Sequence, residues 1–317
     1  MHNGNKILKA AAPFRHPGLL NFKRAPFEAW KNNGGRVTKS CYPPRILHGA
    51  AFRWELPTIF KCRGEARLRF VEPVSMSFDT FPDYARYEIV PMIWDCWPQY
   101  FEKTCKWLKH HQVHTAIFTS SQTADRMRER LPYMNIIWCA EALNDSGYKK
   151  GMPLKERSID VLEFGRSNEN VVRAENLIKR GLNYICTKQD GKFVYTNEQL
   201  CEAMGKAKVS IALPRSMTQP EITGDVETLT QRYWECMFSR MVMVGHAPKE
   251  LVDFIGYNPV VELKSNVSSE ALVADVVGHI GDYQGLVDRN RETAERLGSW
   301  NVRMKWLMNE LSAVYKI

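Results

Sequence analysis

The sequence predicts an α/β protein with two Rossmann-like domains, and two observations lead to this prediction. From Tyr87 onward, short apolar runs alternate with helical segments, a pattern typical of parallel sheets that are buried on both faces. The alternation stops at a polar stretch over residues 144–158 and then begins again, as expected for a linker between domains. The chain has 317 residues, 44% of them hydrophobic, so it is long enough to bury two cores.

The first domain is predicted over residues 1–155, and its pattern is clear only in its second half. Pro, Gly and Arg interrupt every apolar run of the first 80 residues, so the pattern assigns no strands there. The second half predicts strands at 87–94, 114–120 and 134–140, with helices at 100–111 and 121–131.

The second domain is predicted over residues 156–300, and there the alternation continues to the end of the sheet. The tail from Ser268 is predicted to be helical, because its apolar residues recur at helical spacing. Strands are predicted at 159–165, 182–187, 209–214, 241–245 and 259–263, with helices ending near Lys179, around 198–206 and within 227–240.

The charge of the chain is concentrated near its N-terminus. The formal net charge is +9, and residues 1–75 contain fourteen Lys or Arg against four Glu. This one-sided basic region favours an anionic partner such as lipid headgroups, a phosphorylated acceptor or nucleic acid. A solvated basic surface without a partner is the alternative.

The cysteines and the hydropathy predict the compartment. Eight cysteines are scattered without a C-x-x-C pair, which is typical of a reducing compartment. No apolar run approaches the roughly 18 to 20 residues that span a bilayer, and we expect no signal peptide. The sequence therefore predicts a cytoplasmic protein, with the basic region at the inner face of the membrane.

A pair of glutamates is the most specific motif in the chain. Glu227 and Glu235 are separated by seven residues. Thr228 followed by Gln231 is a helix-start pattern, which places Glu227 just before a helix and Glu235 about two turns inside it. The free backbone N–H groups of such a helix start can bind a diphosphate. The same spacing also occurs at solvated helix edges, so the pattern alone leaves both interpretations open.

The surrounding sequence favours the first interpretation. The stretch from VSIALPRS through ETLTQRYWE to CMFSRMVMVGHAPKEL resembles the retaining glycosyltransferases of the two-Rossmann-domain, or GT-B, class, especially glycosyltransferase family 4 of bacterial polysaccharide synthesis. It matches the family pattern of strand, Pro-Ser-type loop, E-x7-E, helix, strand and Gly. Upstream, IDVLEFGR resembles the strand-Gly-Arg that opens the nucleotide-binding domain of that family. The resemblance covers roughly residues 156–263.

The resemblance implies an overall architecture. It implies two Rossmann-like domains facing a cleft, the first on the acceptor side and the second for the nucleotide sugar, and a C-terminal helix over residues 301–317 that packs back on the first domain. The family also has an N-terminal strand followed by a Gly-rich loop. Gly34-Gly35 is the candidate for that loop, although no clear strand precedes it.

The resemblance also assigns roles around the two glutamates. Glu235 would accept hydrogen bonds from the ribose hydroxyls of the donor. Glu227 would be the catalytic residue, holding the transferred sugar and favouring positive charge at its anomeric carbon. The backbone N–H groups of Thr228, Leu229 and Thr230 would bind the diphosphate as it leaves.

Positive charge for the diphosphate is expected from two arginines. Arg166 follows the predicted Gly of IDVLEFGR, and the resemblance implies that it contacts the diphosphate. Arg215 follows a predicted strand, where a doubly wound sheet places ligand-binding side chains, so we expect a second phosphate contact there. The lysine that the family places after its Gly-Arg is missing, and Arg173 and Lys188 are the alternatives.

Asp95 is the candidate on the acceptor side. It follows a predicted strand and lies between Trp94 and Trp97, so it could contact the acceptor or a sugar ring. A structural aspartate that caps the local backbone is the alternative. The sequence contains no Asp-x-Asp pair, in agreement with metal-independent transfer.

Together these observations predict a retaining hexosyltransferase-type glycosyltransferase that needs neither a metal nor another cofactor. It would move a sugar from a nucleotide-sugar donor to a saccharide or lipid-linked acceptor in cell-surface polysaccharide synthesis. Its partners would be these substrates and an anionic membrane surface, with no nucleic acid expected. A non-catalytic scaffold and a nucleic-acid-binding protein using the basic region are the alternatives. An inverting transferase or a sugar-nucleotide epimerase also stays open.

Overall fold

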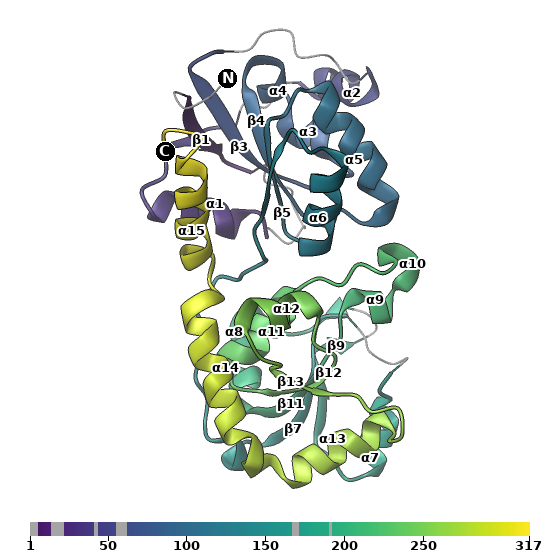
Figure 1. Ribbon diagram of the computed structural model, residues 1–317. Coiled ribbons are helices and arrows are strands. Elements are labelled where there is room, and N and C mark those ends of the chain that lie inside the picture. Colours follow the sequence, from purple (N-terminus) through teal and green to yellow (C-terminus); the bar gives the residue numbers. More distant parts are fainter. Residues whose placement is uncertain (1–5, 14–21, 41–43, 55–61, 167–170, 190–191) are drawn as a thin grey trace. The chain divides into compact units, whose positions relative to one another are not determined.

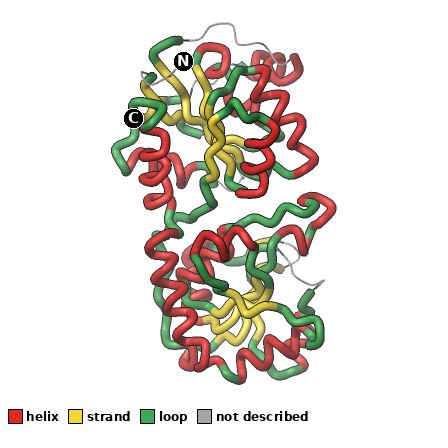
Figure 2. Tube along the Cα trace, in the orientation of Figure 1, coloured by secondary structure: helices red, strands yellow, loops and turns green. Residues whose placement is uncertain are grey.

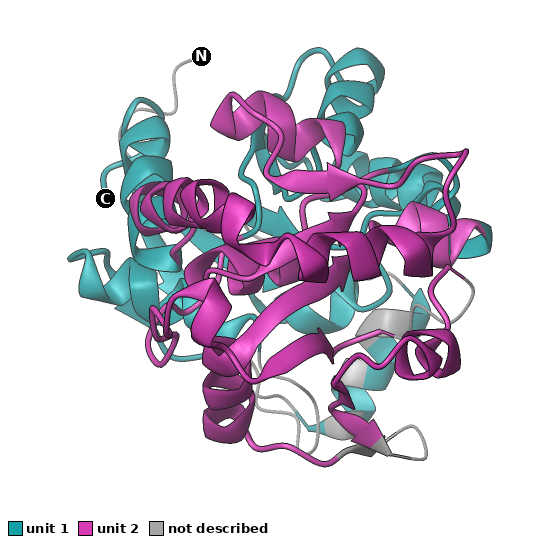
Figure 3. Ribbon diagram, turned by 90° about the horizontal axis from the view of Figure 1, so that it is seen from below, with its two compact units in different colours: residues 1–141, 221–226, 300–317 teal, residues 142–220, 227–299 magenta. Residues whose placement is uncertain are grey.

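The computed structural model describes residues 6–13, 22–40, 44–54, 62–166, 171–189 and 192–317 (Figure 1). The chain forms two compact units, coloured separately in Figure 3. Unit 1 consists of residues 1–141, 221–226 and 300–317, and unit 2 consists of residues 142–220 and 227–299. Each unit contains its own parallel sheet with helices packed around it (Figure 2). The predicted α/β class with two Rossmann-like units is therefore confirmed.

Unit 1 is built on a six-stranded sheet in the order β2-β1-β3-β4-β5-β6, with all neighbouring strands parallel. Its strands are β1 (Ile7–Ala11), β2 (Val37–Thr38), β3 (Glu65–Val71), β4 (Glu88–Ile93), β5 (Thr115–Phe118) and β6 (Asn135–Trp138). Its helices are α1 (Arg24–Asn32), α2 (Arg45–Trp54), α3 (Met76–Thr80), α4 (Asp83–Arg86), α5 (Pro98–His110), α6 (Ser121–Arg130) and α15 (Trp300–Ser312).

The first three strands lie in the N-terminal 80 residues, where the sequence pattern assigned none. Strand β2 has only two residues, and ion pairs interrupt the apolar pattern of β1 and β3. Lys9 of β1 binds Glu65 of the adjacent β3 at 2.6 Å. Arg67 and Arg69 are buried in β3 and bind Glu65 and Asp83 at 2.7 and 3.1 Å. A buried charge is tolerated in a core only when it is paired in this way, and such pairing is invisible in a single segment of sequence.

The predicted return of the C-terminal helix to the first unit is confirmed. Helix α15 packs against α1, and its Leu307 and Leu311 are fully buried. The chain beyond it continues along β1, where the N–H of Leu8 donates to the carbonyl of Lys316 and the N–H of Lys316 donates to the carbonyl of Lys6.

The glycine pair of unit 1 does not occupy the predicted position. Gly34 and Gly35 follow helix α1 and precede β2, whereas the expected glycine-rich loop follows a strand. They therefore lie at the amino ends of the strands and not at the carboxyl edge where ligands bind to such sheets. Most of the segment between β1 and α1, residues 14–21, lies outside the described residues.

Unit 2 is built on a five-stranded parallel sheet in the order β13-β12-β11-β7-β8. All five predicted strands are present: four are slightly shorter than predicted, and the one predicted at 209–214 is shifted to Ala207–Ala212. The sheet strands are β7 (Ile159–Glu163), β8 (Tyr184–Cys186), β11 (Ala207–Ala212), β12 (Val242–Gly245) and β13 (Val260–Glu262), and a small hairpin pairs β9 (Lys188–Gln189) with β10 (Lys192–Phe193). The helical segments are η1 (Leu154–Glu156), α7 (Ala174–Lys179), α8 (Asn197–Lys206), α9 (Arg215–Thr218), α11 (Gln231–Phe238), α12 (Lys249–Ile255), α13 (Ser269–Gly278), η2 (Ile280–Tyr283) and α14 (Gln284–Leu297).

One more short helix, α10 (Pro220–Thr223), begins in unit 2 and ends in unit 1. The polar stretch over residues 144–158 belongs to unit 2. Its Leu154 is buried in the core of that unit, and Arg157 donates to the carbonyl of Ala207 at 2.7 Å. None of the helices in the described part of the chain is long and apolar enough to cross a membrane.

The topology of unit 2 brings several loops together. Because its strands are parallel, the segments that follow β7, β11, β12 and β13 all leave the same edge of the sheet. Helix α11 connects β11 to β12, so its N-terminus also lies at this carboxyl edge. Ligands bind at this edge in doubly wound sheets.

Candidate functional site

Helix α11 begins later than predicted. It spans Gln231–Phe238 with Thr230 as its N-cap, and the cap makes no side-chain hydrogen bond. The prediction of Thr228 as N-cap is therefore wrong. Leu229 is fully buried and its N–H donates to Glu250 Oε1 of α12 at 3.1 Å, so tertiary contacts hold this residue in the segment before the helix. Of the three N–H groups predicted to donate hydrogen bonds to the diphosphate, that of Leu229 thus already has a partner.

Glu235 lies on the first turns of α11, as the fifth residue of the helix. The hydroxyl of Tyr148 donates to Glu235 Oε1 at 3.1 Å. Burial raises the pKa of Glu235 above its ordinary value, although the hydrogen bond from Tyr148 and the positive charge of Arg232 act in the opposite direction. Glu235 is thus a carboxyl group held in a poorly solvated place, where ionisation is unfavourable without a partner.

Glu227 lies in the extended segment before α11 and contacts a histidine. The Nε2 atom of His246 lies 3.3 Å from Glu227 Oε1, and the Nδ1 atom of the same ring lies 2.9 Å from Glu262 Oε2. About a third of each of these three side chains is exposed. The three residues come from the segment before α11, the end of β12 and the end of β13, so they meet at the carboxyl edge of the sheet.

Arg232 joins helix α11 to the loop after β7. Its side chain is buried, and its Nη2 atom donates to the carbonyls of Phe164 and Arg166 at 2.9 and 3.0 Å. The guanidinium also lies 5.6 Å from the centre of the Phe164 ring. A buried guanidinium needs hydrogen-bond acceptors, and here the backbone of the loop supplies them. Arg232 therefore fixes the loop that carries Arg166 against the helix that carries Glu235.

Gly165 makes this contact possible. Its φ is +74°, in the left-handed region that favours glycine, and a Cβ atom there would lie 2.5 Å from Arg232 Nη2. The residue thus has two independent reasons to be glycine, one in its own backbone and one in the buried arginine.

The two predicted phosphate-binding arginines follow neighbouring strands. Arg166 follows β7, and Arg215 begins the short helix α9 after β11, where its Nε donates to Gln219 Oε1 at 2.8 Å. Both leave the carboxyl edge of the sheet, as predicted from the sequence pattern. Residues 167–170, which continue from Arg166, lie outside the described residues.

The alternatives for a second cation lie on other elements. Arg173 is the N-cap of α7, and its backbone N–H donates to Glu270 Oε1 at 3.0 Å. Lys188 lies in β9 of the small hairpin. Arg232, which the sequence analysis did not select, lies closer to the predicted site, because it occupies α11 itself.

Asp95 follows β4 in unit 1, as predicted, and its side chain is exposed. Its φ is +49°, a left-handed conformation that is uncommon for residues other than glycine. The carbonyl of Asp95 accepts a hydrogen bond from the N–H of Trp97 at 2.8 Å. The conformation turns the chain sharply from β4 into α5, and its role toward an acceptor stays a prediction.

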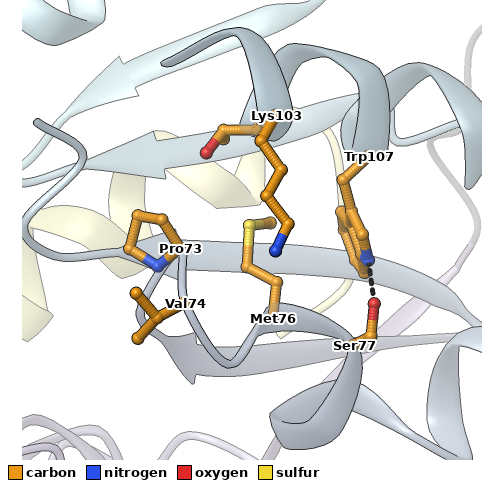
Figure 4. A pocket seen from close by; sticks show the side chains of 7 residues that line it. Pro73, Val74, Met76, Ser77, Lys103 and Trp107 are labelled. Carbon is orange, nitrogen blue, oxygen red and sulfur yellow. Dashed lines mark hydrogen bonds between the residues drawn. The ribbon is translucent and has the colours of Figure 1, made fainter. Parts of the chain in front are cut away.

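A small pocket in unit 1 lies apart from all predicted site residues. Figure 4 shows it between the segment after β3 and helix α5, where Trp107 Nε1 donates to Ser77 Oγ at 2.9 Å. The pocket is lined by Pro73, Val74, Met76, Ser77, Lys103, Thr104 and Trp107.

Within the described ranges there is no group of three or more His, Cys, Asp or Glu side chains that could hold a metal ion.

Several residues at the carboxyl edge of unit 2 were not selected from the sequence. His246 directly follows the Gly of MVMVG, within the stretch that carries the family resemblance, so its position was the available signal. Arg232 and Glu250 also lie within that stretch. Tyr148 and Glu262 lie outside it, in segments without a motif.

Comparison with known proteins defines the fold. No protein-family model and no curated protein matches this sequence. Among solved structures, the chain is similar to Anabaena Alr3699/HepE in complex with UDP and glucose, with a TM-score of 0.61 and 8% sequence identity over 96% of this chain and 99% of that one. It is also similar to AviGT4, a glycosyltransferase involved in avilamycin A biosynthesis, with a TM-score of 0.55 and 11% identity over 96% of each chain. The chain has the GT-B fold.

Other matched structures are longer than this chain, which spans 63% of the chain matched in the GtfA/B complex and 54% of TarM. At identities of 8 to 11%, these likenesses concern the fold. Any assignment of activity must come from the site itself.

Substitution of Gly165 tests the Arg232 contact. We expect Gly165→Ala to lower the free energy of unfolding by about 2 to 4 kcal/mol, because it adds left-handed strain of roughly 1 to 2 kcal/mol to displacement of the buried guanidinium. Gly181→Ala is the matched control, since Gly181 has a φ of +82° with nothing near its Cβ position. Urea denaturation of both variants provides the comparison, and equal losses would contradict the Arg232 contact.

The buried carboxyl of Glu235 predicts a pH-dependent stability difference. Because its folded-state pKa is raised above the ordinary 4.5, the folded protein holds this proton more tightly than the unfolded chain does. The resulting stabilisation is complete below pH 4.5 and is lost as the pH rises through the raised pKa. Glu235→Gln should therefore be more stable than the wild type at pH 8, and the difference should shrink toward pH 4.

Thermal unfolding from pH 4 to pH 8 measures this difference. Glu198→Gln on α8, at an exposed position, is the matched control, and it should stay within the roughly 0.5 kcal/mol of ordinary surface substitutions. A Glu235→Gln variant that loses stability at pH 8 would show that the carboxylate is stabilised in the free protein.

Proposed function

We propose that this protein is a glycosyltransferase that moves a sugar from a nucleotide-sugar donor to a saccharide or lipid-linked acceptor. The observation that supports this most is the placement of Glu227 and Glu235 at the carboxyl edge of the unit 2 sheet, one before helix α11 and one within it. The GT-B fold is a second support. HepE, a protein of similar fold, has been crystallised with UDP-glucose, which favours a nucleotide sugar as the donor here.

In this proposal Glu235 accepts hydrogen bonds from the ribose of the donor. Its carboxyl group already accepts one from Tyr148, so a ribose hydroxyl would take the second oxygen or replace the tyrosine. A ribose supplies two adjacent O–H donors, which would compensate the poor solvation of the ionised carboxylate.

The diphosphate would lie at the N-terminus of α11, near the loop after β7. The backbone N–H groups of Thr228 and Thr230 and the side chains of Arg166 and Arg215 are the proposed contacts, together with the positive end of the helix dipole. We add the buried charge of Arg232 as the second cation of this site, because its hydrogen bonds hold it against the Arg166 loop.

Glu227 is the proposed catalytic residue. A carboxylate there would hold the sugar and stabilise positive charge at the anomeric carbon while the diphosphate leaves. We propose transfer with retention of configuration and without a metal, following the family resemblance. The anomeric configuration of the product, read by NMR, separates this proposal from an inverting transferase.

A nucleotide screen tests the donor site. We expect one of UDP, GDP, ADP or CMP, at about a hundred times its dissociation constant, to stabilise the folded protein by roughly 2.7 kcal/mol in a thermal-shift assay. Glu235→Ala should weaken that binding at least about tenfold, since it removes hydrogen bonds to a charged group worth roughly 1.5 to 3 kcal/mol. Glu198→Ala, at an exposed position on α8, is the control.

Two outcomes would contradict the donor site. If no nucleotide stabilises the wild type, the hypothesis of a nucleotide-sugar donor is wrong. Binding of an oligonucleotide or of partner enzymes then becomes the alternative. If a nucleotide binds Glu235→Ala as tightly as the wild type, the ribose role of Glu235 is wrong.

We also propose that unit 1 binds an anionic membrane surface, where a lipid-linked acceptor would be found. Helix α2 carries three exposed apolar side chains, Ile46, Leu47 and Trp54, with exposed fractions of 85, 51 and 68%. Ile46 and Trp54 are eight residues apart and lie on similar faces of the helix. The surrounding residues 1–75 carry ten more positive than negative charges. An apolar helix face within a basic region fits anionic lipid headgroups.

Vesicle sedimentation tests the membrane proposal. We expect the wild type to bind vesicles of phosphatidylglycerol and phosphatidylcholine at low salt and to be released at high salt. The double variant Ile46→Ser/Trp54→Ser should bind at least about tenfold more weakly, because burial of each side chain contributes roughly 1.5 to 3 kcal/mol. Tyr133→Ser, which changes an exposed aromatic residue elsewhere in unit 1, should bind like the wild type. Equal binding by all three proteins would contradict the role of α2.

A further inference from the structure

His246 is held rigidly at the carboxyl edge of unit 2 by its own backbone. Its N–H donates to the carbonyl of Ala212 at 3.0 Å, and its carbonyl accepts from the hydroxyl of Tyr233 at 2.7 Å. The preceding Gly245 allows this close approach, because a Cβ atom there would lie 1.9 Å from the carbonyl oxygen of Ala212. The backbone of His246 is therefore fixed between the end of β11 and helix α11.

The imidazole ring of His246 is fixed from one side by Glu262. Glu262 is the last residue of β13 and is paired in register with Gly245 of β12. Its Oε2 lies 2.9 Å from His246 Nδ1, while its Oε1 accepts from the N–H of Ala247 at 2.9 Å and from Asn258 Nδ2 at 2.8 Å. With both oxygens bound, the Glu262 carboxylate has one orientation. An ionised carboxylate only accepts hydrogen bonds, so Nδ1 carries the proton of this contact.

The other ring nitrogen faces Glu227. Nε2 lies 3.3 Å from Glu227 Oε1, close enough for a protonated imidazole to form an ion pair with this carboxylate. Glu227 itself lies between α10 and α11, in a segment without regular secondary structure. Glu262 and His246 orient its side chain from the two neighbouring strand ends.

We infer that His246 is a positioning residue for Glu227, and that Glu262 holds His246 in the orientation required. This inference rests on the proposed function, in which Glu227 contacts the transferred sugar. His246 and Glu262 determine where the Glu227 carboxylate lies relative to the sugar. The nucleotide part of the donor is bound by α11 and the arginines. Loss of His246 should therefore weaken contacts with the sugar and spare contacts with the nucleotide.

NMR of the free protein tests the contacts without a ligand. In protein labelled with 15N-histidine, His246 should show a protonated Nδ1 that changes in Glu262→Gln and an Nε2 signal that moves in Glu227→Gln. The exposed His279 on the C-terminal side of α13 should respond to neither variant. A His246 ring that responds to neither variant overturns the inference.

Binding of UDP and UDP-glucose tests the functional part. We expect UDP-glucose to bind the wild type more tightly than UDP, and we call the ratio of the two affinities the sugar-dependent gain. His246→Leu should reduce this gain at least about tenfold, while its affinity for UDP stays within about threefold of the wild type. His246→Gln, whose amide can still donate to Glu227, should recover most of the gain. Glu227→Ala should lose the same gain, and adding His246→Leu to it should cause no further loss, because the two residues act as one unit.

The outcomes separate this inference from the proposed function. Independent, additive losses from Glu227→Ala and His246→Leu overturn the positioning role, as does a sugar-dependent gain that survives His246→Leu. A wild type that binds neither UDP nor UDP-glucose while its NMR contacts are intact contradicts a uridine-nucleotide donor, and it does so without contradicting the contacts of His246 with Glu227 and Glu262.

Discussion

The geometry of the unit 2 site depends on the hydrogen bonds of the Arg232 guanidinium, which is buried at the start of helix α11. The carbonyls of Phe164 and Arg166 accept these bonds and replace those that the group would make with water. The loop after β7 must therefore turn toward the helix, and only glycine fits at position 165 between them. The loop of Arg166 and the helix of Glu235 are thus fixed to each other by one side chain, before any ligand is present.

The difference between the two halves of the chain shows which parts of a fold a sequence reveals. All five strands of unit 2 were predicted, although Asp160 of β7 and Lys208 of β11 form an ion pair, because each strand keeps a short apolar run. In unit 1, β1 contains Lys9, and β3 contains Arg67 and Arg69. These charges are neutralised by Glu65 and Asp83. Since the partners lie on other segments, the local pattern reads as a loop, although the folded sheet contains a strand.

The same limit applies to the candidate site. Glu227 and Glu235 could be predicted because their spacing and their context lie in one continuous stretch. Tyr148 and Glu262 could not, because they come from other segments: Tyr148 binds Glu235 across 87 residues of sequence, and Glu262 binds His246 across 16. The helix start was misplaced for a similar reason. Thr228 has a suitable pattern, but burial of Leu229 and its hydrogen bond to Glu250 of α12 hold this segment outside the helix, which begins at Gln231.

The chemistry of Glu235 supports a ligand more strongly than its spacing does. A carboxyl group at this place in α11 is poorly solvated, and its raised pKa reflects the unfavourable burial of its charge. Glutamine would accept the same hydrogen bond from Tyr148 without that penalty, so the internal contacts of the protein do not explain a glutamate. A ligand with paired hydroxyl donors does explain it, since it would stabilise the ionised form. In the proposed function, the cost of this residue to the free protein is a consequence of donor binding, as expected where stability and function conflict.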